Sequence, residues 1–336
     1  RAYVVRKDGW RGSSEAYQRM LQKAKIEQIR QKLKANQTVF VNNLIVTLPD
    51  DVQPIGDDKK TVDISELKKP EPVQISLPRS PNSVGVIDGQ HRLYSYYQTK
   101  DDDPVIAKLR NQQNLLVTGV VFPPGMSGPA RERFEASLFL GINSNQTNAP
   151  KALRQEIQTI LKPFANEAIA KRVMRELALA GPLEGHVERY FFDKGLLKTT
   201  SVVTYGLAPL VKLSGDDSLY TKIPPSLKDR LDDGDESALQ EYAIYCREKI
   251  NEVLGAMKKA LGSNRWTTDK NVQNRILNVT YINSFLILLR LLIRDGKGIS
   301  GSYLDSRIGQ IGSFGFKNYH SSQYNRMAQD IYKKYF

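Results

Sequence analysis

The chain has 336 residues, with 49 Lys and Arg against 36 Asp and Glu, a formal net charge of +13 at pH 7. Its 40% hydrophobic content is enough for a sizeable core, so the composition excludes a disordered or fibrous protein. The single cysteine, Cys246, excludes an intrachain disulfide and a cysteine-ligated zinc finger, and the most apolar run, residues 285–293, is far shorter than the roughly 20 residues of a membrane span. We therefore expect a cytoplasmic protein with no membrane partner.

Local patterns predict a mixed first half. Apolar residues at helical spacing predict a helix that ends near Asn36, with Ser13 or Ser14 as its N-cap. A surface loop is expected over residues 50–72. Strands are expected over residues 38–48, 73–77, 83–87 and 115–122, and helices directly after residue 87 and over residues 129–140.

The second half is predicted to be almost wholly helical. Pro150 suits a first helical position, and further helices are expected over residues 271–294 and in the C-terminal tail. Residues 296–313 are expected to form a loop, whereas the pattern around residues 198–213 fits either a helix or a strand. The expected fold class is α+β, with a basic helix in residues 1–37, an α/β core in 38–150 and a mainly helical domain in 151–336.

The most informative segment is Asp88-Gly89-Gln90-His91-Arg92, which joins a predicted buried strand directly to a helix. Glycine permits a sharp turn and close approach of a ligand, and the free N–H groups of a helix start favour an anion. Arg92 offers a fork for phosphate, Gln90 can donate hydrogen bonds, His91 can move a proton, and Asp88 can hold Mg²⁺ or orient His91. The alternative is a structural turn, in which Asp88 caps the helix and Arg92 pairs with an acid.

A second candidate segment, residues 139–148, is predicted to lie between two helices. Its amide side chains, which include Asn143 and Gln146, suit a loop that contacts a base, a sugar or a metal-bound water. Helix capping by these residues is the alternative.

These two segments resemble the motifs of the DGQHR-domain family. That family includes the DndB-like proteins of DNA phosphorothioation clusters and relatives in clusters that insert 7-deazaguanine bases into DNA. The first motif corresponds to residues 88–92, and the aliphatic-Asn-x-x-Gln motif to residues 142–146. The layout also resembles the ParB/sulfiredoxin fold, whose members bind CTP or ATP. The resemblance implies that Gly89, Gln90, His91 and Arg92 hold phosphates, with Asn143 and Gln146 closing the site.

The sequence departs from the ParB pattern at two positions. Ile142 stands in place of a glutamate and Gln146 in place of an arginine, so Mg²⁺ binding and hydrolysis do not follow directly from the resemblance. Asp88 is the remaining candidate for holding Mg²⁺, and Asp88 and His91 are the candidate catalytic residues. The phosphate turn also lacks the reactive cysteine of sulfiredoxin, which excludes sulfinic-acid reductase chemistry.

The charge distribution favours nucleic acid as a partner. Residues 1–36 carry a net charge of +7, residues 37–125 carry −2 and the remainder carries +8. Such basic segments attract polyanions because bound cations release counterions from phosphates. The candidate DNA-binding residues all lie in the first predicted helix: Lys23, Lys25, Arg30, Lys32 and Lys34. The alternative is a charged helix face that is merely solvated.

Three functional hypotheses follow. The first is an ATP-binding protein, or one that binds another nucleoside triphosphate, associated with DNA in a bacterial modification or phage-defence system, with ATPase activity as a further expectation. The second is a DNA-binding transcriptional regulator of the modification cluster without such activity. The third is a scaffold that binds the DNA-modification enzymes of the same cluster through its helical half.

Overall fold

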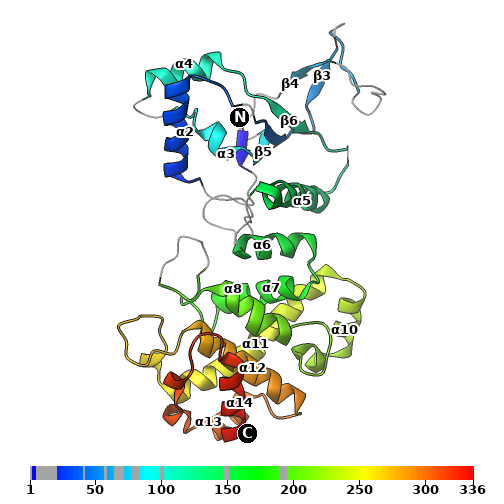
Figure 1. Ribbon diagram of the computed structural model, residues 1–336. Coiled ribbons are helices and arrows are strands. Elements are labelled where there is room, and N and C mark those ends of the chain that lie inside the picture. The colour runs from blue at the N-terminus through cyan, green and yellow to red at the C-terminus, as the bar shows by residue number, and fades with distance from the viewer. Residues whose placement is uncertain are drawn as a thin grey trace. The chain divides into compact units, whose positions relative to one another are not determined.

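The computed structural model describes residues 2–4, 21–40, 42–56, 59–63, 72–77, 83–98, 102–123, 125–146, 151–188 and 195–336. The chain divides into two compact units, unit 1 (residues 1–148) and unit 2 (residues 149–336) (Figure 1). The mixed α+β class expected from the sequence is confirmed. None of the helices in the described ranges combines the length and hydropathy needed to span a bilayer.

Unit 1 is built on a four-stranded mixed sheet with the order β1-β5-β2-β6. Strand β2 pairs antiparallel with β5 and parallel with β6, and β1 runs parallel to β5. Buried Leu44, Val46 and Val86 pack together at the centre of the sheet, as expected for β-branched and aliphatic residues on a covered face. The strands are β1 (Ala2–Val4), β2 (Leu44–Thr47), β5 (Val84–Asp88) and β6 (Val117–Val120).

A separate two-stranded antiparallel sheet pairs β3 (Gln53–Ile55) with β4 (Gln74–Ser76). The strand predicted over residues 73–77 is therefore confirmed. The surface loop predicted over residues 50–72 is wrong where β3 forms, because Pro54 is tolerated in a sheet that consists only of edge strands. Of the strand predicted over residues 38–48, only β2 forms, and residues 38–40 do not pair with another strand.

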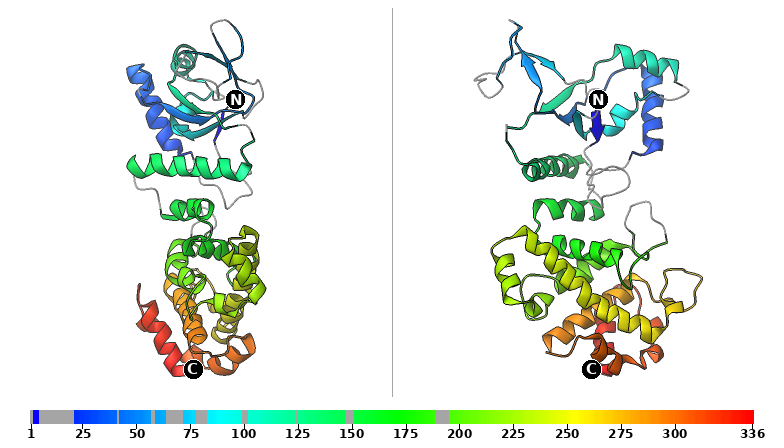
Figure 2. Two further views of the ribbon diagram at one scale, coloured as in Figure 1. Left: turned by 90° about the vertical axis from the view of Figure 1, so that its right-hand side faces the viewer. Right: turned by 180° about the vertical axis from the view of Figure 1, so that it is seen from behind.

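Four helices of unit 1 are α2 (Lys23–Asn36), α3 (Gln90–Tyr94), α4 (Pro104–Gln112) and α5 (Gly128–Gln146). Buried Leu33 of α2 packs with Tyr96 and with Ile106 of α4, so α2 and α4 meet at one side of the unit (Figure 2). The predicted end of the first helix at Asn36 is confirmed, whereas Ser13 and Ser14 lie outside the described residues. Helix α4 has no counterpart among the predicted elements.

Unit 2 is helical, and its core surrounds α11 and α12. Side chains of Ile282, Phe285 and Leu289 on α12 are buried there, which accounts for the apolar pattern in its sequence. The main helices are α6 (Lys151–Leu161), α7 (Asn166–Leu179), α10 (Pro225–Asp232), α11 (Glu236–Leu261), α12 (Val279–Arg294), α13 (Gly301–Ile308) and α14 (Tyr324–Tyr335).

Two predictions for unit 2 are wrong and one ambiguity is resolved. Helix α12 begins only after Asn278, whose side chain accepts the Tyr281 N–H, and not at residue 271. Helix α13 lies within the predicted loop 296–313, because Ser300 caps it and Leu304 is buried. Residues 199–210 are helical and include a π-helix, η2 (Val202–Leu207). The predicted C-terminal helix is confirmed by α14.

Candidate functional site

The turn between β5 and α3 depends on Gly89. Its φ of 91° lies in the left-handed region, and a Cβ at this position would come within 2.2 Å of Leu44 Cδ2. Glycine is therefore required by the backbone conformation and by the packing against β2. The space beside its Cα is occupied by the side chains of Leu44 and Arg92.

The guanidinium of Arg92 lies inside a set of intrachain acceptors. Its Nη1 donates to the carbonyl oxygens of Asn42 at 2.8 Å and Asn43 at 2.9 Å, and its Nη2 donates to Asp88 Oδ2 at 2.8 Å. The Arg92 side chain is only 18% exposed and that of Asp88 24%. These contacts tie the end of β5 to the residues that lead into β2, and they neutralise both charges. This is the structural alternative that the sequence left open for Arg92.

His91 contacts the start of helix α2. Its Nε2 accepts a hydrogen bond from the backbone N–H of Gln22 at 3.1 Å. Gln22 is the N-cap of α2 and makes no side-chain capping bond, so the imidazole satisfies one of the N–H groups that a helix start leaves without a helical partner. An imidazole that accepts at Nε2 is neutral and carries its proton on Nδ1. The neighbouring Gln90 is buried.

Asn143 and Gln146 lie in the last turn of helix α5, which packs against β5. The prediction that this segment forms a loop is wrong up to Gln146, because helix α5 continues through it. The side chains of Asn143 and Gln146, like residues 147 and 148, lie outside what the structure describes.

The described residues around Asp88 do not fit a Mg²⁺ site. No group of three His, Cys, Asp or Glu side chains suited to a metal ion occurs in the part of the chain that the structure describes. The carboxylate of Asp88 is the single acid of the turn, and it is already bound by the guanidinium of Arg92. Mg²⁺ prefers oxygen ligands in octahedral geometry, which this pair does not supply.

The five cations predicted to bind DNA divide into two groups on α2. Lys23, Lys25 and Lys32 are exposed. Arg30 and Lys34 instead contact the body of unit 1: Arg30 Nη1 donates to the carbonyl oxygen of Tyr97 at 3.3 Å, and Lys34 Nζ pairs with Asp103 at 3.0 Å. The exposed lysines are thus carried on a helix that is anchored by its other cations.

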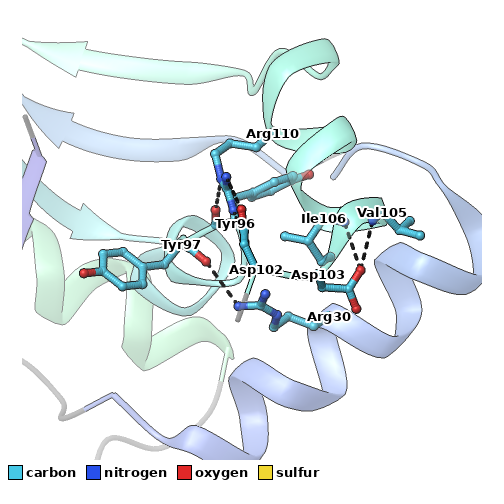
Figure 3. A network of polar contacts seen from close by, with 8 residues as sticks. All are labelled: Arg30, Tyr96, Tyr97, Asp102, Asp103, Val105, Ile106 and Arg110. Atoms are coloured by element: carbon cyan, nitrogen blue, oxygen red, sulfur yellow. Dashed lines mark hydrogen bonds and ion pairs between the residues drawn. The ribbon is translucent and has the colours of Figure 1, made fainter. Parts of the chain in front are cut away.

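A polar network holds described residues on either side of the gap between α3 and α4, namely Tyr96, Tyr97, Asp102 and Asp103 (Figure 3). Arg110 binds both carboxylate oxygens of Asp102 at 2.8 and 2.9 Å, and its Nε donates to the carbonyl oxygen of Tyr96 at 2.6 Å. The carboxylate of Asp102 raises the pKa of Arg110 above its ordinary value. The network therefore holds the backbone of Tyr96 and Tyr97 from two helices, α2 and α4.

Asp103 joins this network from the start of α4. Its carboxylate accepts from Lys34 and from the N–H groups of Val105 and Ile106. The hydrogen bond from Lys34 lowers the pKa of Asp103 below its ordinary value of 3.8, and the two helix N–H groups act in the same direction. Asp103 therefore combines an N-cap with an ion pair that fastens α2 to α4.

The sequence did not predict that Tyr96 is buried while its neighbour Tyr97 is exposed. Tyr96 is buried, with its ring against Phe40 and its hydroxyl donating to Gln113 Oε1 at 2.6 Å. Tyr97 is 64% exposed and stacks on Tyr94, with the ring centroids 6.2 Å apart. The local sequence gives no indication that Tyr97 is an open aromatic ring beside the basic helix α2.

In comparisons with known proteins, no family model matches this sequence, and no match was found among the curated proteins or among the solved structures.

Proposed function

We propose that this protein binds DNA through helix α2 of unit 1, in a bacterial DNA modification or defence system. The observation that carries the proposal is the exposed pair Lys25 and Lys32 on a helix that is fastened to the rest of unit 1. The two lysines are seven residues apart and so lie on the same face, about 10 Å from each other along the axis. Lys23 adds a third exposed cation in the first turn.

The anchoring of α2 supports this role. The His91 imidazole holds its N-terminus, the bond from Arg30 to the Tyr97 carbonyl holds its middle, and the pair of Lys34 with Asp103 holds its last turn. A rigid cationic helix loses little conformational freedom when it meets a polyanion, so more of the electrostatic attraction appears as affinity. In this proposal the Asp88–Arg92 segment organises the DNA-binding helix.

Contacts of lysine with phosphate position a protein on DNA without reading its sequence. The exposed lysines of α2 would supply such contacts, and we therefore expect binding that depends weakly on sequence and strongly on salt. The resemblance to DndB-like proteins supports DNA as the polyanion. DNA binding of this kind agrees with the second hypothesis, a DNA-binding regulator without triphosphatase activity.

Nucleotide binding at Asp88–Arg92 is the second candidate. The observation in its favour is that the ion pair is partly exposed and contains the arginine that the family resemblance assigns to phosphate. A phosphate oxygen would take the place of Asp88 on Nη2 while Nη1 stays on the carbonyls of Asn42 and Asn43. ATP binding in this mode needs no Mg²⁺ on Asp88, and no hydrolytic step is assigned to the turn.

The first experiment is fluorescence anisotropy of labelled DNA with the full chain. We expect the double variant Lys25→Gln/Lys32→Gln to bind more weakly than wild type, about equally for duplexes of different sequence. The matched control is Lys108→Gln/Lys317→Gln, which removes two exposed lysines elsewhere and the same net charge. Equal affinities for the two double variants would refute the proposal.

The nucleotide candidate is tested by Asp88→Asn with ATP, CTP and GTP, each with and without Mg²⁺. If phosphate replaces Asp88 on Arg92, the variant binds nucleotide more tightly, because a competing carboxylate has been removed. If Asp88 instead holds Mg²⁺, the variant loses Mg²⁺-dependent binding and phosphate release. If neither wild type nor Asp88→Asn binds nucleotide, the nucleotide candidate is refuted and the turn has a structural role alone.

A further inference from the structure

Tyr97 presents an open aromatic face at the surface of unit 1. With 64% of its surface exposed, it is one of the two most exposed large hydrophobic side chains among the described residues. Its ring stacks on Tyr94 with an angle of 29° between the planes, so it is supported on one side. An exposed ring of this kind is a surface on which another planar group can stack.

The backbone that carries this ring is held by hydrogen bonds. The Tyr97 N–H donates to the carbonyl oxygen of Tyr94 at 3.1 Å, and the Tyr97 carbonyl accepts from Arg30. On the preceding residue, the Tyr96 carbonyl accepts from Arg110, while the Tyr96 ring is buried. Figure 3 shows the Tyr97 ring directed away from this network, whereas its carbonyl oxygen points to Arg30. Little backbone conformational entropy is therefore lost when a ligand stacks on the ring.

Cations accompany the aromatic face. Arg30 of α2 contacts the Tyr97 carbonyl, and Lys23 lies seven residues earlier, which places it on the same side of α2 as Arg30. Lys23 is exposed in the first turn of this helix. An open tyrosine ring on a surface that also carries cations is a combination with which proteins hold single strands: the base stacks on the ring and the backbone phosphates meet the cations.

We propose that Tyr97, supported by Tyr94, is a stacking site for an unpaired base, so that unit 1 binds single-stranded DNA in preference to duplex DNA. This inference rests on the proposed DNA binding by α2 and adds the form of DNA that is bound. A duplex keeps its base faces stacked inside and offers none to Tyr97, whereas a single strand offers one at each nucleotide. Lys25 and Lys32, which lie on the other side of α2 from Lys23 and Arg30, attract either form of DNA, whereas the ring contributes only to binding of the single strand.

The test compares an oligothymidylate with a duplex hairpin on the full chain. We expect Tyr97→Ala to weaken binding of the single strand between about 5-fold and 150-fold and to leave duplex binding unchanged. Tyr97→Phe keeps the ring and should retain the affinity of wild type. Because the ring is exposed, neither change disturbs the core. The matched control is Tyr205→Ala, which removes another exposed, stacked tyrosine, on Tyr324 in unit 2.

A crosslinking readout locates the base directly. An oligothymidylate carrying 5-iododeoxyuridine, irradiated in the complex, should attach to the peptide that contains Tyr97, and Tyr97→Ala should abolish this product. The inference is overturned if Tyr97→Ala binds the single strand as wild type does, if it loses single-strand and duplex binding equally, or if the crosslink maps elsewhere. DNA binding that depends on Lys25 and Lys32 but not on Tyr97 removes this inference and leaves the proposed function standing. Absence of DNA binding by wild type removes both.

Discussion

Arg92 Nη2 lies 2.8 Å from Oδ2 of Asp88, which is four residues earlier in the chain. Its Nη1 donates to the carbonyl oxygens of Asn42 and Asn43, some fifty residues away. One side chain thus connects the end of β5 and the start of α3 to the residues that lead into β2. The pair is a structural joint in unit 1, and its removal has consequences for stability that are separate from any ligand.

Replacing Arg92 tests this joint. Arg92→Ala removes all three bonds, and we expect unit 1 to lose about 2–3 kcal/mol of unfolding free energy. Arg92→Lys should recover less than half of this loss, because one ammonium group cannot serve three acceptors with the geometry of a guanidinium. Urea unfolding followed by hydrogen-exchange mass spectrometry of β2 and β5 reports on unit 1 specifically. Protection of these strands that is unchanged in Arg92→Ala would show that the joint contributes nothing.

Gly89→Ala tests the turn itself. The new Cβ would lie 2.2 Å from Leu44 Cδ2 in a residue with a φ of 91°, so we expect a loss of about 1–3 kcal/mol in the stability of unit 1. Gly141→Ala is the matched control, because Gly141 lies in helix α5 with nothing near the position of a Cβ. That change should raise stability by up to about 1 kcal/mol. Equal effects of the two substitutions on the urea midpoint of unit 1 would contradict the described packing of Gly89.

His91 should control the order of the first turn of α2. In His91→Ala the Gln22 N–H loses its acceptor, and we expect its hydrogen exchange to accelerate about 2-fold to 12-fold. His91→Gln retains an acceptor oxygen and should exchange more slowly than His91→Ala. Exchange at Gln22 that is the same in wild type and His91→Ala would argue against the capping contact.

Asp103 should make the docking of α2 sensitive to acid. Its pKa is lowered in the folded chain, first by the hydrogen bond from Lys34, so its contribution is fully present above the unfolded pKa near 3.8. The contribution is lost as the pH falls through the lower folded value. Asp103→Asn keeps a good N-cap but removes the ion pair, and we expect its urea midpoint to fall less than that of wild type between about pH 6 and about pH 3. Parallel midpoints over this range would contradict a role for the ion pair.

The sequence predicted the elements whose cues are local. The β-branched run that became β5, the glycine turn after it and the end of α2 at Asn36 are each determined by neighbouring residues, and each formed close to its expected position. The C-terminal helix was predicted for the same reason. By contrast, Asn278 starts α12 through a single capping bond inside a longer apolar pattern, and Ser300 starts α13 inside a Gly/Ser-rich stretch that is typical of a loop.

The partners of the candidate site residues could not be predicted, because they are distant in the sequence. His91 meets Gln22 across 69 residues, and Arg92 meets Asn42 across 50. No local pattern shows whether a guanidinium will face a phosphate or a carbonyl oxygen. The contrast between Tyr96 and Tyr97 has the same origin, because the bonds from Arg110 and Arg30 that orient this segment come from two other helices.

The salt dependence of DNA binding tests the role of helix α2 most directly. For wild type, the logarithm of the observed association constant should fall linearly with the logarithm of the salt concentration. For Lys25→Gln/Lys32→Gln the slope should be smaller by about 2, because two phosphate contacts are lost, whereas Lys108→Gln/Lys317→Gln should keep the wild-type slope. One common slope for all three proteins would contradict DNA binding by α2.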